Sequence, residues 1–292
     1  MITRFELVAN AKLRLEDFLL QRFEEHSKMY LRGLVKDELC EVNGRAENIG
    51  YRLRPRDFVE ISVDEDRGTA MRPEFISLDI AFEDEHLIVV NKPTGMLMHP
   101  SHREHSGTLL NGLVFYLNDN SGRHAREGAV RIRPGLIHRL DKETSGLVVV
   151  AKNERAHRIL SGHFMKHRIE KRYLALVEGS IEENAGTIRA PIGRYDELKF
   201  WGVRADGKDS ETRFVVRERR GETTLVELEP VTGRTNQLRI HCQSIGHPIV
   251  GDVPRGGRKF SCLCLHAYRL GFPHPATGAQ VVFENAWVVP EV

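Results

Sequence analysis

The stretch Pro134–Asn153 reads PGLIHRLDKETSGLVVVAKN. It contains Leu147–Ala151, a β-branched apolar run that is typical of a buried strand. Asp141 precedes this strand, with Arg139 and Lys142 close by on either side. The pattern predicts a loop that a rigid strand holds in place, which is where catalytic groups are commonly found. We expect the neighbouring cations to keep Asp141 ionised, because a nearby positive charge favours the carboxylate.

Two other interpretations of Asp141 compete with a catalytic role. An acid beside an arginine is often a structural carboxylate in a salt bridge. A protein-kinase catalytic loop requires His, Arg and Asp to be contiguous, with an Asn further on. Here Leu140 separates Arg139 from Asp141, and no glycine-rich phosphate loop precedes them, which excludes the kinase interpretation. The salt-bridge interpretation stays open on these residues alone.

The whole string resembles the core motif of the RluA/RluD family of RNA pseudouridine synthases, in which HRLD is followed by TSGL and an apolar strand. The matching residues are His138–Asp141 and Thr144–Leu147. The aspartate of this motif is catalytic in the family, so the resemblance implies that Asp141 is the catalytic residue. It also implies that Arg139 helps to hold the target base outside its helix.

The composition is that of an ordinary soluble globular protein with one large or two smaller domains. The chain has 292 residues, of which 40% are hydrophobic and 29% charged, and its net charge is +2. No apolar run of membrane-spanning length and no secretory signal is visible. Four cysteines in such a chain do not suggest a disulfide framework. We therefore expect a cytoplasmic protein with no membrane partner, and the small net charge neither requires nor excludes nucleic acid.

Residues 5–63 have the pattern of a small separate unit. Hydrophobic residues recur at helical spacing over 13–23, and 31–35 suggests a second short helix. Cys40–Gly44 is a strand that runs into an Asn-Gly turn, and Phe58–Val63 alternates as a closing strand does. The order helix, helix, hairpin, strand resembles the alpha-L RNA-binding domain of the ribosomal protein S-four type.

A basic face is expected on this small unit although its net charge is negative. Residues 1–67 carry 12 lysines and arginines against 14 acidic residues, whereas residues 28–56 carry seven against four. The phosphate backbone of RNA responds to such local clustering of charge. A solvated surface of mixed charge is the alternative. The expected RNA-binding residues are Lys28, Arg32, Lys36, Arg45, Arg52, Arg54 and Arg56.

Further segments match family motifs in the family's order. Asn91–Pro100 (NKPTGMLMHP) carries Pro93 and Gly95, which shape a sharp turn. Lys171–Gly179 has the pattern of a strand. The resemblance implies that the ring of Tyr173 packs on the target base, and an aromatic face stacks on any base. A strand tyrosine with its ring in the core is the alternative.

Thr232–Cys242 (TGRTNQLRIHC) is the second strong candidate for a site. The resemblance implies that Arg234 pairs with Asp141 and that Leu238 packs near the target base. A guanidinium suits this pairing, because it stays charged and offers a carboxylate a fork of donors. The family usually has histidine where this chain has Asn236. Both side chains form hydrogen bonds, so we expect the same backbone, but any role that requires an imidazole is left open.

A metal centre is not expected. Cys262, Cys264 and His266 alternate along one strand face, but their spacing is not that of a zinc finger. A buried thiol behaves as a small hydrophobe. The family's reaction changes no oxidation state and needs no external energy source, so the resemblance implies that no cofactor is bound.

Many short strands and few helices favour an α+β class over a wound parallel sheet. For the catalytic domain, the resemblance implies a mixed, largely antiparallel sheet with a central cleft. The expected domains are the alpha-L domain over residues 1–67, a polar linker over 68–77 and the catalytic domain over 78–292.

The resemblance implies an isomerase that converts uridine to pseudouridine within RNA, where the uracil leaves C1′, turns and rejoins through C5. The target base must first leave its stack. Whether Asp141 attacks C6 of the uracil or acts at C1′ stays open. Large-subunit ribosomal RNA is the expected substrate of a monomeric enzyme that does not act on DNA. Transfer RNA, or a non-catalytic RNA-binding or ribosome-assembly role on the same fold, are the alternatives.

A glycoside hydrolase is a further alternative, but it normally requires two carboxylates that flank the scissile bond. Only one acid of this chain, Asp141, is the acid of a recognised site motif. The sequence therefore favours the isomerase.

Overall fold

The computed structural model describes residues 2–23, 26, 28–64, 72–101, 104–118, 132–197 and 200–291. The chain forms two compact units, one of residues 1–76 and 99–119 and the other of residues 77–98 and 120–292. Part of the predicted linker lies outside the described residues. The domain limits drawn from the sequence stay a prediction.

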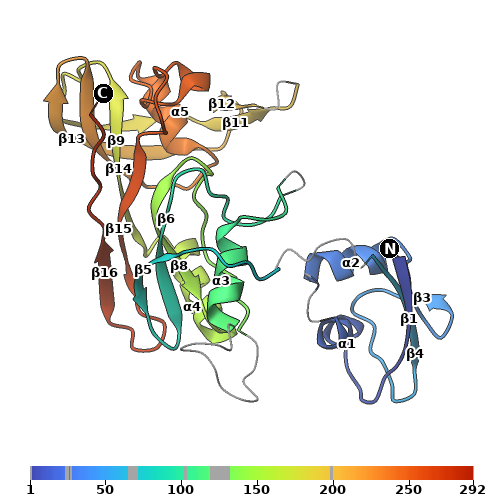
Figure 1. Ribbon diagram of the computed structural model, residues 1–292. Helices are drawn as coiled ribbons and strands as arrows, with labels where there is room; N and C mark the ends of the chain where they lie inside the picture. The colour runs from blue at the N-terminus through green and yellow to red at the C-terminus, as the bar shows by residue number, and fades with distance from the viewer. Residues whose placement is uncertain are drawn as a thin grey trace. The chain divides into compact units, whose positions relative to one another are not determined.

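The first unit holds a four-stranded antiparallel sheet in the order β1-β4-β2-β3 (Figure 1). Its elements are β1 (Ile2–Val8), α1 (Leu15–Arg22), α2 (Lys28–Lys36), β2 (Cys40–Val42), β3 (Arg45–Ala46), β4 (Phe58–Asp64) and α3 (Leu109–Asn118). The two predicted helices, the hairpin and the closing strand are confirmed. Asn43 and Gly44 have the positive φ angles of 52° and 75° that a tight hairpin turn requires. Strand β1 is not among the predicted elements; it pairs along its whole length with β4.

The second unit is built on a ten-stranded mixed sheet in the order β10-β13-β14-β9-β15-β8-β6-β5, with β16 paired to β15 and β7 to β8. Only β8 and β15 are paired parallel among the described strands. The expected α+β class with a largely antiparallel sheet is confirmed. The strands are β5 (Asp79–Glu83), β6 (Leu87–Lys92), β7 (Gly135–Leu136), β8 (Ser145–Ala151), β9 (Glu170–Glu178), β10 (Ala185–Arg189), β13 (Glu211–Arg220), β14 (Thr223–Pro230), β15 (Leu265–Pro273) and β16 (Gln280–Glu284).

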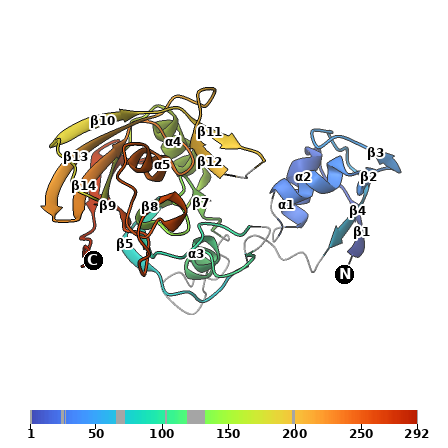
Figure 2. The same ribbon diagram turned by 90° about the horizontal axis from the view of Figure 1, so that it is seen from above.

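Three helices and a small hairpin complete the second unit. The helices are α4 (Glu154–Met165), α5 (Gln237–Ser244) and the single 3-10 turn η1 (Val253–Arg255). The hairpin consists of β11 (Ile192–Tyr195) and β12 (Phe200–Val203) and forms a sheet of its own. It lies beside α5 (Figure 2). Within the described ranges, none of the helices combines the length and apolar character needed to cross a membrane.

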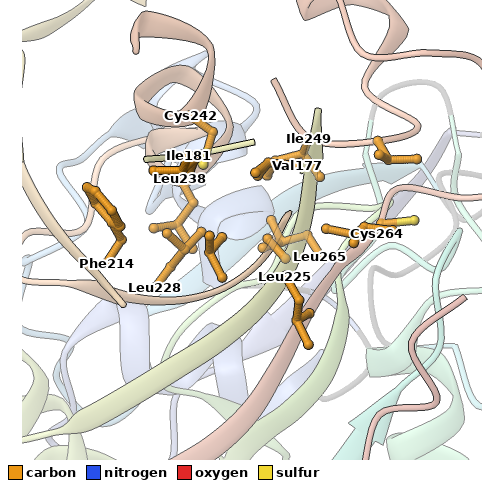
Figure 3. Close-up of a cluster of buried hydrophobic side chains, with 14 of the residues drawn as sticks. Val177, Ile181, Phe214, Leu225, Leu228, Leu238, Cys242, Ile249, Cys264 and Leu265 are labelled. Carbon is orange, nitrogen blue, oxygen red and sulfur yellow. The ribbon is translucent and has the colours of Figure 1, made fainter. Parts of the chain in front are cut away.

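Apolar packing fixes α5 against the large sheet. Leu238 and Cys242 of this helix belong to one buried cluster with Val177, Leu228 and Leu265 of the sheet (Figure 3). Removing such side chains from water stabilises the contact by roughly 25 cal/mol per Å² of apolar surface. The helix is therefore positioned rigidly, and so are the polar residues on its other side.

Strand β8 holds the predicted catalytic loop in place. It is buried from Gly146 to Ala151 and pairs antiparallel with β6. At its start it runs parallel to β15, where Gly146 lies opposite Ala267. The two strands approach so closely there that a Cβ atom on Gly146 would lie 2.3 Å from the Ala267 carbonyl oxygen. Gly146 also has a φ angle of +115°, which only glycine adopts readily.

We predict that Gly146→Ala lowers the free energy of unfolding by about 2 to 5 kcal/mol, because both backbone strain and overlap with β15 must be relieved. Gly162→Ala is the matched control, since no atom lies within 4 Å of its Cβ position inside α4. Alanine should leave stability there unchanged or raise it by up to about 1 kcal/mol. Urea unfolding of both variants measures the difference. Equal stabilities would show that the β8–β15 contact does not constrain the loop.

Candidate active site

The second unit contains a pocket of about 520 Å³ next to the loop that precedes β8. Its lining comes from that loop, from α4 and β9, and from the segment that leads into α5. All five residues predicted for the active site line this pocket: Asp141, Arg139, Tyr173, Arg234 and Leu238. The fold thus brings together motifs that are far apart in the sequence.

A buried lysine ties the Asp141 loop to the turn after β6. Lys92 is fully buried, and its Nζ donates hydrogen bonds to the carbonyl oxygens of Pro93, Met96 and Lys142 at 2.8, 2.9 and 3.0 Å. Thr94 adds a second link, because its hydroxyl donates to the Glu143 carbonyl at 2.6 Å. The segment NKPTG therefore does more than form a turn: it clamps the residues that follow Asp141.

His138 secures the other end of the same loop. Its Nε2 accepts a hydrogen bond from the Val149 amide at 3.1 Å, and its ring stacks on Phe164 of α4 at 4.8 Å. Burial lowers the pKa of His138 to about 3, so the ring stays neutral and can act as an acceptor. The loop is held at both ends before any substrate binds.

Arg239, rather than the predicted Arg234, is the cation paired with Asp141. The Arg239 guanidinium lies 4.0 Å from the Asp141 carboxylate and 3.8 Å from that of Glu143. Arg234 is exposed, and its Nε donates to the Asp209 carbonyl at 3.2 Å. The prediction was wrong because Arg234 lies in the turn before α5. Arg239 lies on the helix itself, on the side that faces the loop.

A second carboxylate fixes the position of Arg239. Asp252 is inaccessible to solvent and accepts two hydrogen bonds of 2.7 Å from the Arg239 guanidinium. Arg255 lies on the other side of Asp252, with its Nε 3.8 Å from the carboxylate. Arg239, Asp252 and Arg255 therefore form a largely buried cluster, which the more accessible carboxylates of Asp141 and Glu143 approach at Arg239. Such pairing is what allows charges to remain away from water.

Burial sets the direction in which the acidity of Asp141 shifts. Removal from water raises its pKa above the ordinary value, while Arg239 acts in the opposite direction. Glu143 raises it as well, and Arg139 and Arg255 lower it. The sequence argument considered only the cations, whose effect on the pKa is opposite to that of burial. About a third of the Asp141 side chain, 35%, is still accessible, so a ligand in the pocket can reach the carboxylate.

An aromatic and an aliphatic side chain form the apolar part of the pocket. Tyr173 on β9 and Leu238 on α5 pack in the same hydrophobic cluster. Burial, and then the nearby Asp141 carboxylate, raise the pKa of Tyr173 well above its ordinary value, so the phenol stays neutral. The wall beside Asp141 is thus suited to a flat, partly apolar group.

The turn before α5 depends on an amide pair. Asn236 has the left-handed φ of 55°, a conformation that asparagine tolerates better than most residues. Gln237 is buried, and its Oε1 accepts hydrogen bonds from the Thr232 hydroxyl at 2.7 Å and the Arg234 amide at 3.0 Å. That asparagine keeps the backbone expected with histidine at this position stays a prediction. The Asn236 side chain lies at the pocket, within 3.5 Å of the Arg239 guanidinium.

Comparisons with known proteins show the family of this chain. A family model described as RNA pseudouridylate synthase matches residues 86–244. The chain belongs to this family. An uncharacterized RNA pseudouridine synthase of Bacillus subtilis is 42% identical, over 93% of this chain and 89% of its own. A ribosomal large subunit pseudouridine synthase D of Pseudomonas aeruginosa is 35% identical, over 93% of this chain and 88% of its own.

A solved structure, Human RNA Pseudouridylate Synthase Domain Containing 1, has a TM-score of 0.60 and 29% sequence identity. It covers 73% of this chain, and the match covers 85% of the human chain. The family and its named members identify an isomerase that acts on RNA. The resemblance first seen in the HRLD motif is therefore confirmed at the level of the family.

For an RNA pseudouridine synthase, the lining of this pocket is chemically simple. Asp141 is the sole carboxylate among the described residues that line it. The part of the chain that the structure describes has no group of three or more His, Cys, Asp or Glu residues arranged to hold a metal. Cys264 and His266 have other contacts: the thiol is buried, and the ring accepts or donates a 2.8 Å bond with the Ser145 hydroxyl. A ligand in this pocket would therefore meet one carboxylate among the described lining residues, that of Asp141.

Three residues of this site are missing from the sequence prediction: Lys92, Arg239 and Asp252. Lys92 stands inside a segment that matches a family motif, Asn91–Pro100, but a motif does not show which of its polar residues turns inward. Arg239 would have been found from the helical phase of Gln237–Ser244, since helix geometry sets which face each residue occupies.

We predict that the Lys92 clamp has a distinctive pH dependence. Burial lowers the pKa of Lys92 to about 8, against an ordinary value of 10.5. Between these values the unfolded chain binds the proton and the folded chain does not, so stability from this residue rises with pH. The free energy of unfolding of wild type minus that of Lys92→Met should therefore increase between about pH 8 and 10.5, by up to about 3 kcal/mol.

Urea unfolding of both proteins across this pH range measures the difference, and titration of all other groups cancels. A difference that stays constant or falls with pH would show that the ammonium is not buried as described.

Proposed function

We propose that this enzyme converts uridines of large-subunit ribosomal RNA to pseudouridine, with Asp141 as the group that acts on the target nucleotide. The observation that carries this proposal is a reachable carboxylate in a pocket of about 520 Å³, held by Arg239 and faced by Tyr173. That volume lies within the usual range of small-molecule sites. The relatives named ribosomal large subunit pseudouridine synthase D support the choice of RNA.

The reaction exchanges one bond to C1′ for another. The bond from C1′ to N1 of the uracil breaks, the base turns, and a bond from C1′ to C5 forms. The proton lost from C5 is balanced by a proton gained at N1, so the mass does not change. The target nucleotide must be flipped out of its helix to enter the pocket, which costs a few kcal/mol.

Asp141 suits either mechanism that the sequence leaves open. A carboxylate can attack C6 of the uracil, or it can act at C1′ while the glycosidic bond breaks. In both mechanisms the carboxylate must be desolvated but still charged when it reacts. Arg239, held in place by Asp252, is its positive partner and approaches one oxygen of Asp141. Tyr173 offers a neutral ring for the turning base to stack on.

The first unit adds RNA affinity in this proposal. All seven predicted cations are exposed, but they are not equivalent. Lys28 and Arg32 both pair with Glu16, which reduces their net charge to +1. No described carboxylate forms an ion pair with Arg45, Arg52, Arg54 or Arg56. We therefore assign most of the attraction for phosphate to these four arginines of the alpha-L fold. We further propose that the enzyme acts in the cytoplasm as a monomer.

The direct test compares ribosomal RNA from cells with and without this gene. Pseudouridine mapping should show one or a few large-subunit uridines that lose the modification when the gene is deleted and regain it when wild-type protein is restored. Purified protein should form pseudouridine at the same positions in a transcript. Losses confined to transfer RNA, or no losses at all, would contradict the proposed substrate.

A further inference from the structure

A second groove, of about 450 Å³, adjoins the Asp141 pocket. The two cavities share Gly233, Arg234 and Thr235, so the groove begins at the rim of the pocket. Its other side is the hairpin β11–β12 together with the loop that follows β12. The remaining lining residues are Ile192, Gly193, Arg194, Trp201, Arg204, Asp206, Gly207 and Lys208.

The groove is rigid along its floor. Ile192 and Lys208 exchange two backbone hydrogen bonds, of 2.9 and 2.8 Å, which tie the loop to β11. Gly207 lies so close to β11 that a Cβ atom there would be 2.6 Å from the Ile192 carbonyl carbon. At the base of the hairpin, Arg255 donates to the Trp201 carbonyl at 3.1 Å and lies 4.5 Å from the centre of the Phe200 ring. The hairpin is therefore anchored to the same buried charge cluster that holds Arg239.

The cations of the groove differ in how far their charge is already neutralised. Arg204 makes two hydrogen bonds to the Asp206 carboxylate, which cancels its charge locally. Lys208 and Arg234 are exposed, and neither pairs with a carboxylate of the described residues. Arg234 lies in the segment that the groove shares with the pocket, and Lys208 lies in the loop beside it, next to the Asp209 carbonyl that accepts the Arg234 hydrogen bond. Such charges attract the phosphate backbone of a nucleic acid.

We propose that this groove binds the RNA backbone next to the target nucleotide, with Lys208 and Arg234 as its phosphate-binding residues. The inference rests on the proposed function. When the target nucleotide lies in the Asp141 pocket, the nucleotides next to it in the RNA strand must lie at the rim of that pocket. The groove starts at that rim and carries unpaired positive charge away from it among the described residues. Arg234 thus acts on the strand that carries the substrate, not on Asp141. Trp201 adds an aromatic residue on which a neighbouring base can stack.

The first experiment measures RNA binding without turnover. The double variant Lys208→Met/Arg234→Met is compared with wild type by fluorescence anisotropy, using a short uridine-containing RNA hairpin at several KCl concentrations. We expect affinity to fall about tenfold or more and the slope of log affinity against log salt to become shallower by about 1 to 2. Single-turnover rates at saturating RNA should fall less than affinity does.

The matched control is Arg155→Met/Arg158→Met, which removes the same charge from exposed positions on α4 that line neither cavity. Equal losses in both double variants would show that only net charge matters and would overturn the proposal. It is also overturned if Lys208→Met/Arg234→Met binds RNA as wild type does but loses its saturating rate. That result would show that Arg234 acts with Asp141 in the chemical step and not in RNA binding.

A second experiment identifies the backbone as the ligand. Neutral methylphosphonate linkages are placed on one side of the target uridine and then on the other. Wild type should bind one of the two modified RNAs more weakly than the unmodified RNA. The double variant should bind that modified RNA and the unmodified RNA equally. Additive losses would show that Lys208 and Arg234 do not contact these phosphates. A protein that binds in this way but forms no pseudouridine would contradict the proposed function while supporting the groove.

Discussion

The site depends on one buried ion pair, between Asp252 and Arg239. A carboxylate with no access to water is tolerated only when it is fully paired, and removing one partner of such a pair typically costs about 3 to 5 kcal/mol. Asp252 meets this requirement with two bonds to Arg239 and a further contact to Arg255. The consequence is that Arg239 has one allowed position, and that position faces Asp141. The geometry of the proposed catalytic site and the stability of the fold are thus set by the same charges.

The same cluster connects parts of the catalytic unit that are distant in sequence. Arg239 comes from α5, Asp252 and Arg255 from the segment around η1, and the Trp201 carbonyl and Phe200 ring from β12. Lys92 performs an equivalent task on the other side of Asp141, where it joins the end of β6 to the loop. The carboxylate is therefore placed between two buried cations whose own positions are determined by folding.

Much of this arrangement was predictable from the sequence, and the misses have physical causes. The run Leu147–Ala151 predicted a buried strand because it is apolar and rich in β-branched valines, which favour strands. The joint match of several motifs indicated the family. The partner of Asp141 was misassigned because Arg234 and Arg239 stand in one motif. Only the start of α5 at Gln237 decides which of them turns inward. The effect of burial on the pKa of Asp141 was also missed, since burial is a property of the whole fold and does not appear in local charge.

The central claim is that Asp141 performs the chemistry rather than supporting the fold. Asp141→Asn tests it most directly, because the amide has nearly the same shape but is a poor nucleophile and a poor base. Melting temperature, RNA affinity and single-turnover pseudouridine formation should be measured on the same preparation. We predict a folded protein that binds RNA and forms no measurable pseudouridine. Pseudouridine formation at a rate near that of wild type would contradict the claim, whatever the chain resembles.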